Sequence, residues 1–431
     1  MAPRQPSRRQ GAAPPRRTLG TARRSRPPAG KPPGKHTVRP HREPPARPAA
    51  PLPDARRHHF VPCAAGLEPV LLAEMTGLGL EGCREVPGGV HFEGDAAACY
   101  RANLWLRCGA RVLRVLAEFP CADHEALYAA AYRVEWERLM GVGQTLAVRV
   151  VLGRGRSPAL SHSQFLSRRI KDAIVDRFRA RCGQRPDVDP VQPHLPVHAF
   201  IENGRCTLSL DTSAPPLFMR GYRQGEAAAP LKETLAAGLI ALAGWHGERP
   251  FYDFFCGTGT LPIEAALLAG RRAPGLLRER FAFQHWPDYR PAVFDAQVRQ
   301  ARAAARPVPV PIHASDRDPR AVALARENAR RAGAADAISF SVRDAADFQP
   351  QAGTGLVLIN PPYGERLGDH DSLQPLYRQI GDTLKQRCAG MEAHVFTLHS
   401  ELIKSIGLRT SRRVILFNGP LECRLLQFKL Y

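Results

Sequence analysis

In its second half the chain alternates short apolar runs with longer amphipathic ones, and this alternation restricts the fold more than any other feature. Short apolar runs predict strands, and amphipathic runs predict helices. Strands are expected over residues 250–255, 312–315, 338–343, 355–359 and 394–399, and helices over residues 231–244, 260–270, 319–332 and 373–388. Strands that alternate with helices pair in parallel, so we expect an α/β fold with a doubly wound, mostly parallel sheet. Residues 414–418 and 422–429 predict a C-terminal antiparallel hairpin on that sheet.

Residues 59–223 show an α+β pattern instead. Strands are expected over residues 60–62, 88–92, 111–119, 145–152, 198–202 and 206–211, and helices over residues 67–78, 95–108 and 161–181. Asp95 is a suitable N-cap for the second helix, and Asn203-Gly204 is a strong hairpin turn between the last two strands. The pattern predicts a small sheet covered by helices.

Residues 1–58 form a tail with few aliphatic side chains. It holds 15 lysines and arginines against two acidic residues, Glu43 and Asp54, and so carries most of the chain's net charge of +21. A segment of this composition buries too little apolar surface to offset its conformational entropy, so we expect it to be disordered. It is either an arm that binds a polyanion or a dispensable extension, and both interpretations stay open.

Several classes of protein are excluded. The tail lacks the apolar core of a secretory signal, and no window approaches the ~20 apolar residues of a membrane span. The ten cysteines include no C-x-x-C pair and none stands in a cluster with metal-ligand spacing. We therefore expect a cytoplasmic protein with no membrane association and no metal.

The strand expected over residues 355–359 ends in Asn360-Pro361-Pro362-Tyr363. The Asn360 side-chain oxygen and the Pro361 carbonyl can both accept hydrogen bonds from the exocyclic amine of a nucleobase. The two prolines stiffen the backbone that carries these acceptors, and the Tyr363 ring offers a stacking face. On this motif alone, a strand followed by a proline-rich turn is an equally good interpretation.

A glycine-rich loop lies between the first strand and helix of the second half. It reads Asp253-x-x-Cys256-Gly257-x-Gly259-Thr260. The glycines allow a tight turn and a close approach of the backbone to a ligand, and Asp253 can pair with a ligand ammonium group. Pro262 stands where a dinucleotide-binding fingerprint has its third glycine, so no pyrophosphate site is expected.

Two more acids follow the next two strands. Asp316 is placed to accept hydrogen bonds from ribose hydroxyls, and Asp344 to meet an adenine edge, whereas Asp318 precedes Pro319 and is expected to cap a helix. Because the carboxyl ends of parallel strands meet at one edge of a sheet, these groups and Asn360 form one ordered set. The set predicts a binding site for S-adenosyl-L-methionine.

The helix expected over residues 161–181 has an apolar face and a strongly basic one. The basic face includes Arg168, Arg169, Lys171 and Arg177. Such a face is often simply solvated, but beside a nucleic-acid enzyme it is the first place to expect phosphate contacts.

Taken together, these motifs resemble the bacterial 23S rRNA (guanine-N2-)-methyltransferase family. The most specific strings are Asn360-Pro-Pro-Tyr-Gly-Glu-Arg-Leu367 and the insert over residues 273–286. Further strings are Gly88-Gly-Val-His-Phe92, Tyr100-Arg-Ala-Asn-Leu-Trp-Leu-Arg107, Lys171-Asp-Ala-Ile-Val-Asp176, Asp211-Thr-Ser213, Arg220-Gly-Tyr-Arg223, Ala229-Pro-Leu-Lys-Glu-Thr234 and Asp316-Arg-Asp-Pro-Arg-Ala321.

The resemblance implies a ferredoxin-like region over residues 59–120, a THUMP RNA-binding domain over residues 121–215 and a class I methyltransferase domain over residues 216–431. It adds Arg220 and Arg223 to the expected RNA contacts. The chain departs from the family at Ala214 and Met219, where glycine and lysine are common, and this weakens one phosphate contact.

The implied reaction is methylation of the exocyclic N2 of a guanine in 23S rRNA, either free or in a pre-50S particle, by a monomeric enzyme. Three alternatives stay open: a tRNA guanine-N2 methyltransferase, a DNA adenine-N6 methyltransferase and a non-catalytic factor that binds rRNA. In the catalytic interpretation Asn360 and Pro361 hold the amine, Pro362 stiffens the loop and Tyr363 stacks on the base.

Overall fold

The structure is a computed structural model that describes residues 55–155, 157–224, 231–363, 369–398, 400–419 and 421–431. The predicted disordered tail therefore lies outside the described residues up to residue 54. Strand β1 (Arg57–Pro62) already begins within the last residues assigned to the tail, so the boundary at residue 58 is wrong by at least two residues. None of the described helices is both long and apolar enough to cross a bilayer.

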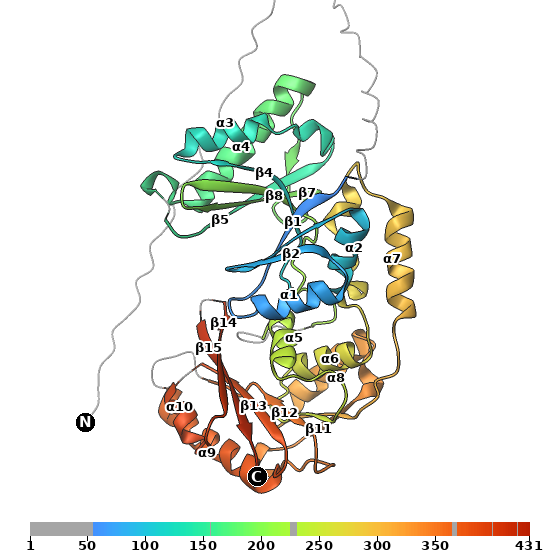
Figure 1. Cartoon of the computed structure of the whole chain (residues 1–431), viewed down its shortest axis with the longest axis vertical. Helices are drawn as coiled ribbons and strands as arrows, with labels where there is room; N and C mark the ends of the chain where they lie inside the picture. The colour runs from blue at the N-terminus through green and yellow to red at the C-terminus, as the bar shows by residue number, and fades with distance from the viewer. Residues whose placement is uncertain (1–54, 156, 225–230, 364–368, 399, 420) are drawn as a thin grey trace, which may run out of the picture. The chain divides into compact units, whose positions relative to one another are not determined.

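An eight-stranded sheet forms the first half of the described chain (Figure 1). Its strand order is β2-β3-β1-β4-β8-β7-β5-β6. The strands after β1 are β2 (Glu81–Val86), β3 (Gly89–Gly94), β4 (Leu113–Pro120), β5 (Thr145–Leu152), β6 (Asp187–Val188), β7 (Leu195–Glu202) and β8 (Arg205–Asp211). Antiparallel pairing of β4 with β8 makes the sheet continuous across residue 120, the predicted division between the ferredoxin-like and THUMP regions.

The first three of the four described α-helices in this half begin where the sequence provides a cap or a proline. Asp95 accepts a hydrogen bond from Ala98 N at 2.9 Å, as predicted, and Asp123 accepts from Ala126 N at 2.8 Å. The helices are α1 (Glu68–Gly77), α2 (Ala96–Trp105), α3 (His124–Arg133) and α4 (Ser163–Cys182). Helix α4 packs against α3 and β5 through its predicted apolar face, where Leu166, Ile170 and Phe178 are buried. Strand β2 and helix α3 were not predicted.

The hairpin predicted across Asn203-Gly204 is confirmed. β7 and β8 pair in antiparallel fashion up to Glu202 and Arg205. Asn203 has φ +49° and Gly204 has φ +72°, the two left-handed positions that a tight two-residue hairpin turn requires.

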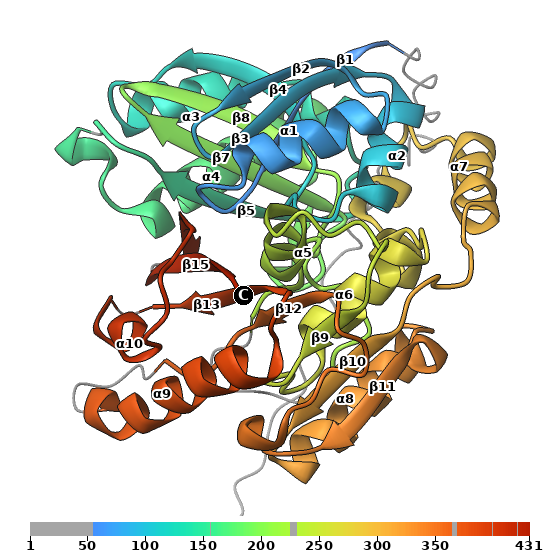
Figure 2. The ribbon, with the colours of Figure 1, turned by 60° about the horizontal axis from the view of Figure 1, so that its bottom comes forward.

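A seven-stranded sheet forms the second half, with strand order β11-β10-β9-β12-β13-β15-β14 (Figure 2). Its strands are β9 (Phe251–Asp253), β10 (Ile312–Asp316), β11 (Ile338–Val342), β12 (Leu356–Ile359), β13 (Glu392–Thr397), β14 (Arg412–Asn418) and β15 (Leu421–Lys429). The first five in this spatial order are parallel, and β15 is antiparallel to both β13 and β14. The predicted doubly wound sheet with a terminal antiparallel hairpin is confirmed.

Helices cover both faces of this sheet. They are α5 (Glu233–Leu242), α6 (Thr260–Ala269), α8 (Pro319–Arg331), α9 (Asp369–Arg387) and α10 (Ser400–Ser405). Successive residues of a strand point to opposite faces of the sheet and so belong to different hydrophobic cores. Phe251 packs in the core formed with α5, α6 and α8, whereas Tyr252 packs in the core formed with α9 and α10. Because β9 and β12 are buried on both faces, their sequences are continuously apolar until their carboxyl ends.

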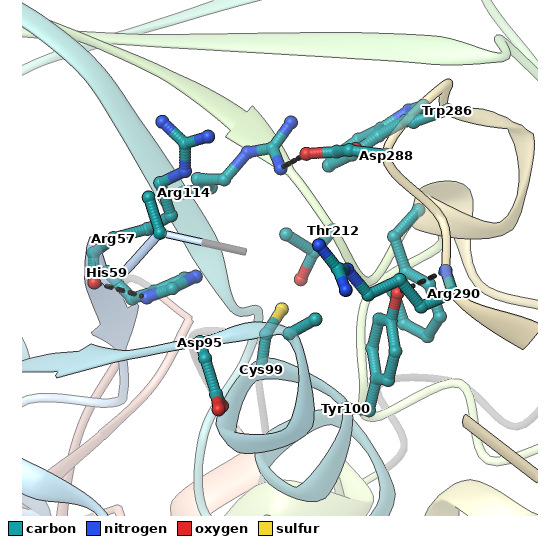
Figure 3. Close-up of a pocket in the computed structure, with 13 residues that line it drawn as sticks. Arg57, His59, Asp95, Cys99, Tyr100, Arg114, Thr212, Trp286, Asp288 and Arg290 are labelled. Carbon is teal, nitrogen blue, oxygen red and sulfur yellow. Dashed lines mark hydrogen bonds and ion pairs between the residues drawn. The ribbon is translucent and has the colours of Figure 1, made fainter. Parts of the chain in front are cut away.

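An insert between α6 and β10 packs back onto the first half of the chain. It contains the short helices η3 (Pro274–Leu277) and η4 (Ala282–His285) and helix α7 (Pro291–Ala303), which packs against α2. A small cavity of about 40 Å³ lies at this junction (Figure 3). Arg114 of β4 forms an ion pair with Asp288 there and lies 4.6 Å from the centre of the Trp286 ring, while Tyr100 Oη accepts from Arg290 N at 3.0 Å.

A buried polar cluster ties the two halves together through Arg220, whose side chain is only 1% exposed. The guanidinium donates to the carbonyls of Leu106, Arg107 and Leu217 at 2.6 to 3.2 Å, and its Nε lies 3.5 Å from Glu264 of α6. The prediction that Arg220 contacts RNA is wrong, because its donors face inward and are used by the protein.

We expect Arg220→Ala to lower the free energy of unfolding by about 3–5 kcal/mol, because it leaves the Glu264 carboxylate buried without its cation. Urea denaturation followed by circular dichroism measures this loss. Arg302→Ala on the exposed face of α7 is the control and should change the stability by less than about 0.5 kcal/mol. A loss below about 1 kcal/mol for Arg220→Ala would contradict a structural role for the cluster.

Candidate active site

Parallel pairing brings the predicted site residues to one edge of the second sheet. β9 pairs in parallel with both β10 and β12, and β10 pairs in parallel with β11. Asp253 and Asp316 end β9 and β10, Asp344 lies two residues after the end of β11, and Asn360 follows β12 directly. All four therefore stand at the carboxyl edge of neighbouring strands, where folds of this kind bind their ligands.

The glycine-rich loop between β9 and α6 turns back across this edge. Gly257 has φ +51° and Gly259 has φ +87°, which side chains with a Cβ rarely adopt. A Cβ at Gly259 would also lie 3.0 Å from the Ala325 side chain, whereas a Cβ at Gly257 would meet nothing within 4 Å. The open space at Gly257 fits a ligand that approaches the backbone of the loop.

Hydrogen bonds fix the loop on β10. Gly257 N donates to Asp316 Oδ2 at 2.9 Å, and Cys256 N donates to the Ser315 carbonyl at 3.0 Å. Burial, followed by the charges of Asp253 and Asp316, raises the pKa of the Cys256 thiol well above its usual range. Cys256 is thus a neutral packing residue in the loop and not a nucleophile.

The carboxylate of Asp253 is almost fully buried and accepts one backbone hydrogen bond, from Phe255 N at 3.0 Å. Burial raises the pKa of Asp253 well above its usual range, the Phe255 N–H opposes this rise and the charge of Asp316 adds to it. A ligand ammonium group beside Asp253 would favour the ionised form, so the residue suits the cationic end of a zwitterion.

The other two acids each have a fixed orientation. Asp316 Oδ1 accepts from Asp318 N at 3.0 Å while its Oδ2 holds the glycine loop. Asp318 accepts from Arg320 N at 2.8 Å and caps α8, as predicted. Asp344 Oδ1 accepts from Ala346 N at 3.0 Å and from Gln379 Nε2 at 2.8 Å. The ribose and adenine roles of Asp316 and Asp344 stay predictions.

Asn360 carries the most informative polar atom of the site. Its Oδ1 is buried and has no hydrogen-bond partner within the described part of the chain. A buried acceptor left in this state costs about 1–3 kcal/mol, which a donor on a bound substrate would recover. Pro361 is buried and Pro362 exposed, and the largely buried Tyr363 accepts a hydrogen bond at its Oη from Asn418 Nδ2 of β14 at 3.2 Å.

Thr260 and Arg223 link the loop to the segment that enters the second half. Arg223 Nη2 donates to Thr260 Oγ1 at 3.0 Å and to the Leu231 carbonyl at 2.8 Å, and its Nε pairs with Glu233 at 2.7 Å. These contacts give Arg223 a role in positioning the loop. Its RNA contact stays a prediction.

One residue that holds the loop was not predicted. Asn328 of α8 is buried; its Oδ1 accepts from Gln224 N at 2.8 Å and its Nδ2 donates to the Thr258 carbonyl at 3.0 Å. It follows Val322 and Ala325 on the buried face of an otherwise regular amphipathic helix. A polar residue on an apolar stripe was the signal that could have found it.

The predicted RNA contacts on α4 have different environments. Arg168 is exposed, Arg169 pairs with Glu125 at 2.8 Å and lies over the Tyr128 ring, and Lys171 pairs with Asp172. These three stay predictions. Arg177 is only 8% exposed and forms a bidentate pair with Glu137 at 2.6 and 2.7 Å. Its predicted RNA contact is wrong, because the pair and the carbonyls of α3 use its donors.

The described residues show no metal cluster, and the small cavity is separate from this site. Within the described ranges no three histidine, cysteine, aspartate or glutamate side chains gather as they would around a metal ion. The small cavity of Figure 3 is lined by residues of the first half and the insert and contains none of the predicted site residues.

Three family profiles match the chain in succession. They are described as the RlmL ferredoxin-like domain over residues 58–113, the THUMP domain over residues 121–211 and the RMKL-like methyltransferase domain over residues 220–427. An RNA methyltransferase candidate of Synechocystis is 40% identical over 376 residues, which cover 87% of this chain and 97% of that protein. The chain belongs to the RMKL-like methyltransferase family.

A further relative of this RMKL-like enzyme is the ribosomal RNA large subunit methyltransferase K/L of Pseudomonas aeruginosa. It is 42% identical over 382 residues, which cover 86% of this chain and 52% of that protein. The RMKL-like chain thus spans about half the length of the K/L relatives that it matches.

Two solved structures match nearly the whole described chain. SMU.472, a methyltransferase candidate in complex with S-adenosylhomocysteine, has a TM-score of 0.77 at 30% identity and covers 87% of this chain and 98% of its own. A predicted N6-adenine-specific DNA methylase of Listeria monocytogenes has a TM-score of 0.77 at 32% identity, with 88% and 97% covered. S-adenosyl-L-methionine is the cofactor of this RMKL-like enzyme, and the glycine loop and the buried Asp253 suit it.

Asp316→Ala should weaken binding of S-adenosylhomocysteine about ten- to a hundredfold, because it removes a charged acceptor and also frees Gly257 N. Isothermal titration calorimetry measures this affinity. Asp336→Ala, at an exposed position beyond α8, removes the same charge away from the site and should bind normally. Unchanged affinity in Asp316→Ala would remove this residue from the cofactor site.

Proposed function

We propose that the enzyme transfers a methyl group from S-adenosyl-L-methionine to the exocyclic N2 of a guanine in 23S rRNA. The observation that carries this proposal is the buried, unpartnered Oδ1 of Asn360 at the carboxyl end of β12, the strand beside the one that leads into the cofactor loop. A donor from the substrate would satisfy this acceptor, and an exocyclic amine provides one.

Bound S-adenosyl-L-methionine supplies an electrophilic methyl group, and the chain's own residues hold the nucleophile in line with it. Asn360 Oδ1 and the Pro361 carbonyl accept the two amine hydrogens. These hydrogen bonds draw the nitrogen lone pair out of conjugation with the ring and stabilise the positive charge that develops on the nitrogen. The new N–C bond would form as the S–C bond breaks, with S-adenosylhomocysteine as the leaving group. No strong base is needed, because the amine becomes acidic as the methyl group arrives and its proton can pass to water.

Tyr363 holds the base in place in this mechanism. Its hydroxyl accepts a hydrogen bond from Asn418 of β14, which fixes the ring at the end of the motif, and in the proposed mechanism the base stacks on this ring. A guanine can meet this ring only after it leaves its own stack, so the target lies unpaired or is flipped out.

RNA, and rRNA in particular, is favoured by the relatives and by the first half of the chain. The K/L relatives are named as enzymes of ribosomal RNA, and the THUMP profile covers residues 121–211. We further propose that the enzyme acts as a monomer in the cytoplasm, on free rRNA or on a pre-50S particle.

A DNA adenine-N6 methyltransferase is the main rival, since adenine's amine presents the same chemistry and one similar structure carries that description. Incubation with labelled S-adenosylmethionine and total nucleic acid, followed by nucleoside analysis, separates the candidates. N2-methylguanosine in 23S rRNA is the expected product. The same nucleoside in tRNA, N6-methyladenine in DNA or no label at all would each contradict the proposal and favour the corresponding alternative.

Asn360→Ala should lower turnover by about two to three orders of magnitude, because it removes a preorganised acceptor that acts on the reacting nitrogen. Methyl transfer to 23S rRNA is measured under single-turnover conditions. Binding of S-adenosylhomocysteine should be unchanged, and this separates a catalytic defect from misfolding. Near-normal methylation would take Asn360 out of the mechanism.

A further inference from the structure

A large cleft with a volume of about 1180 Å³ lies between the two halves of the described chain. Its walls come from the loop before β7, the segment before Arg220, the insert, the start of α5, the end of α8 and the β14–β15 turn. Pockets for small molecules occupy about 300–1,000 Å³, so this cleft is wide enough for part of a polymer. We propose that it holds the unpaired RNA strand that flanks the target guanine, an inference that rests on the proposed function.

The cleft reaches the candidate active site at two points. Asn418, which donates to Tyr363 Oη, lines one wall. Arg223, which donates to Thr260 at the end of the glycine loop, lines another. A strand in the cleft would therefore pass beside both the base-holding motif and the cofactor loop.

The charge of the lining suits a polyanion. Among the described residues the cleft is lined by six lysines and arginines and by two carboxylates, Glu233 and Glu279. Three of the cations are committed to the protein: Arg220 in the buried cluster, Arg223 to Glu233, and Arg278 to four backbone carbonyls. The other three are Lys232, Arg280 and Arg331.

Lys232, Arg280 and Arg331 are exposed and form no ion pair within the part of the chain that the structure describes. Arg280 contacts only the neutral Gln192 side chain, and Arg331 donates to the carbonyls of Gly221 and Tyr222. Three exposed cations on three different walls can each contact a phosphate of a bound strand.

The apolar part of the lining favours an unpaired strand. Met219 is 52% exposed, and the half-buried Phe218 ring beside it lies 5.3 Å from Lys232 Nζ. Arg278 fixes this pair, because it donates to the carbonyls of Pro216 and Met219 at 2.8 and 2.9 Å. Single-stranded RNA presents free base faces that stack on such side chains next to its phosphates, whereas a duplex hides them.

The test compares the variant Lys232→Ala/Arg280→Ala/Arg331→Ala with the control Arg299→Ala/Arg302→Ala/Arg387→Ala. The control removes three exposed cations of α7 and α9 that lie outside the cleft. The probe is a fluorescent 20-nucleotide uridine oligomer, and Kd is measured by anisotropy between 50 and 200 mM salt. Binding of S-adenosylhomocysteine confirms that both variants are folded.

We expect the cleft variant to bind the oligomer about ten- to a hundredfold more weakly at 0.1 M salt. The slope of log Kd against log salt should fall by about 2, since each phosphate contact on a single strand contributes about 0.7. The control should match the wild type. Equal binding by the cleft variant and the wild type, equal weakening in both variants, or a wild-type preference for a duplex of the same length would each overturn the proposal.

A second variant tests the apolar contribution. Phe218→Ala/Met219→Ala should weaken binding roughly tenfold with an unchanged salt slope, because stacking is independent of counterion release. Val342→Ala, an exposed apolar residue of β11, is the control. Unchanged affinity in Phe218→Ala/Met219→Ala would exclude base contacts with these two side chains.

Methylation of 23S rRNA by the wild type is measured in parallel and keeps the two proposals separate. If the wild type binds the oligomer through the cleft but transfers no methyl group to guanine, the proposed function is wrong and the proposal that the cleft binds RNA still holds. If it methylates guanine N2 and the cleft variant binds normally, only the cleft proposal fails.

Discussion

Parallel pairing of β9 with both β10 and β12 is the interaction on which the rest of the structure depends. It places Asp253, Asp316 and Asn360 at one edge although more than a hundred residues separate the first from the last. Since both faces of these strands are buried, polar groups can be carried only at the strand ends. The site is therefore a consequence of the sheet and needs no dedicated scaffold of its own.

The polar groups at this edge are held by the backbone more than by each other. Asp316 fixes Gly257, Asp318 caps α8, and Asn328 holds Thr258 from the neighbouring helix. Two groups at this edge are not compensated by the protein: the carboxyl group of Asp253, with its raised pKa, and the unpartnered Oδ1 of Asn360. The first suits the cationic end of the cofactor, and the second suits an amine donor.

Local sequence signals determine part of this fold. The alternating strands and helices of the second half, the Asp95 cap and the Asn203-Gly204 turn were predictable because each depends on neighbours a few residues away. Strand β2 was not, since its exposed, polar sequence shows no alternation. Helix α3 does carry a local signal, the N-cap residue Asp123, whose side chain accepts from the first turn.

The arginines show a different limit. Arg220 and Arg177 look like any other basic residue in the sequence, but their carboxylate partners lie 44 and 40 residues away. Whether a guanidinium faces RNA or the protein is decided by tertiary packing, which no local pattern encodes. Fold and strand-end residues were therefore accessible from sequence, whereas the direction of long cationic side chains was not.

The pairing of β4 with β8 determines how this chain can be divided. Two family profiles meet near residue 120, yet the hydrogen-bonded ladder from Leu113–Asp211 to Pro120–Arg205 runs directly across that boundary. A fragment cut after Pro120 would present β8 as a bare edge strand, with unpaired N–H and C=O groups that invite aggregation. The two profiles therefore divide the sequence at a point where the sheet is continuous. The smallest fragment that keeps all the strand pairs of this sheet extends from β1 through β8.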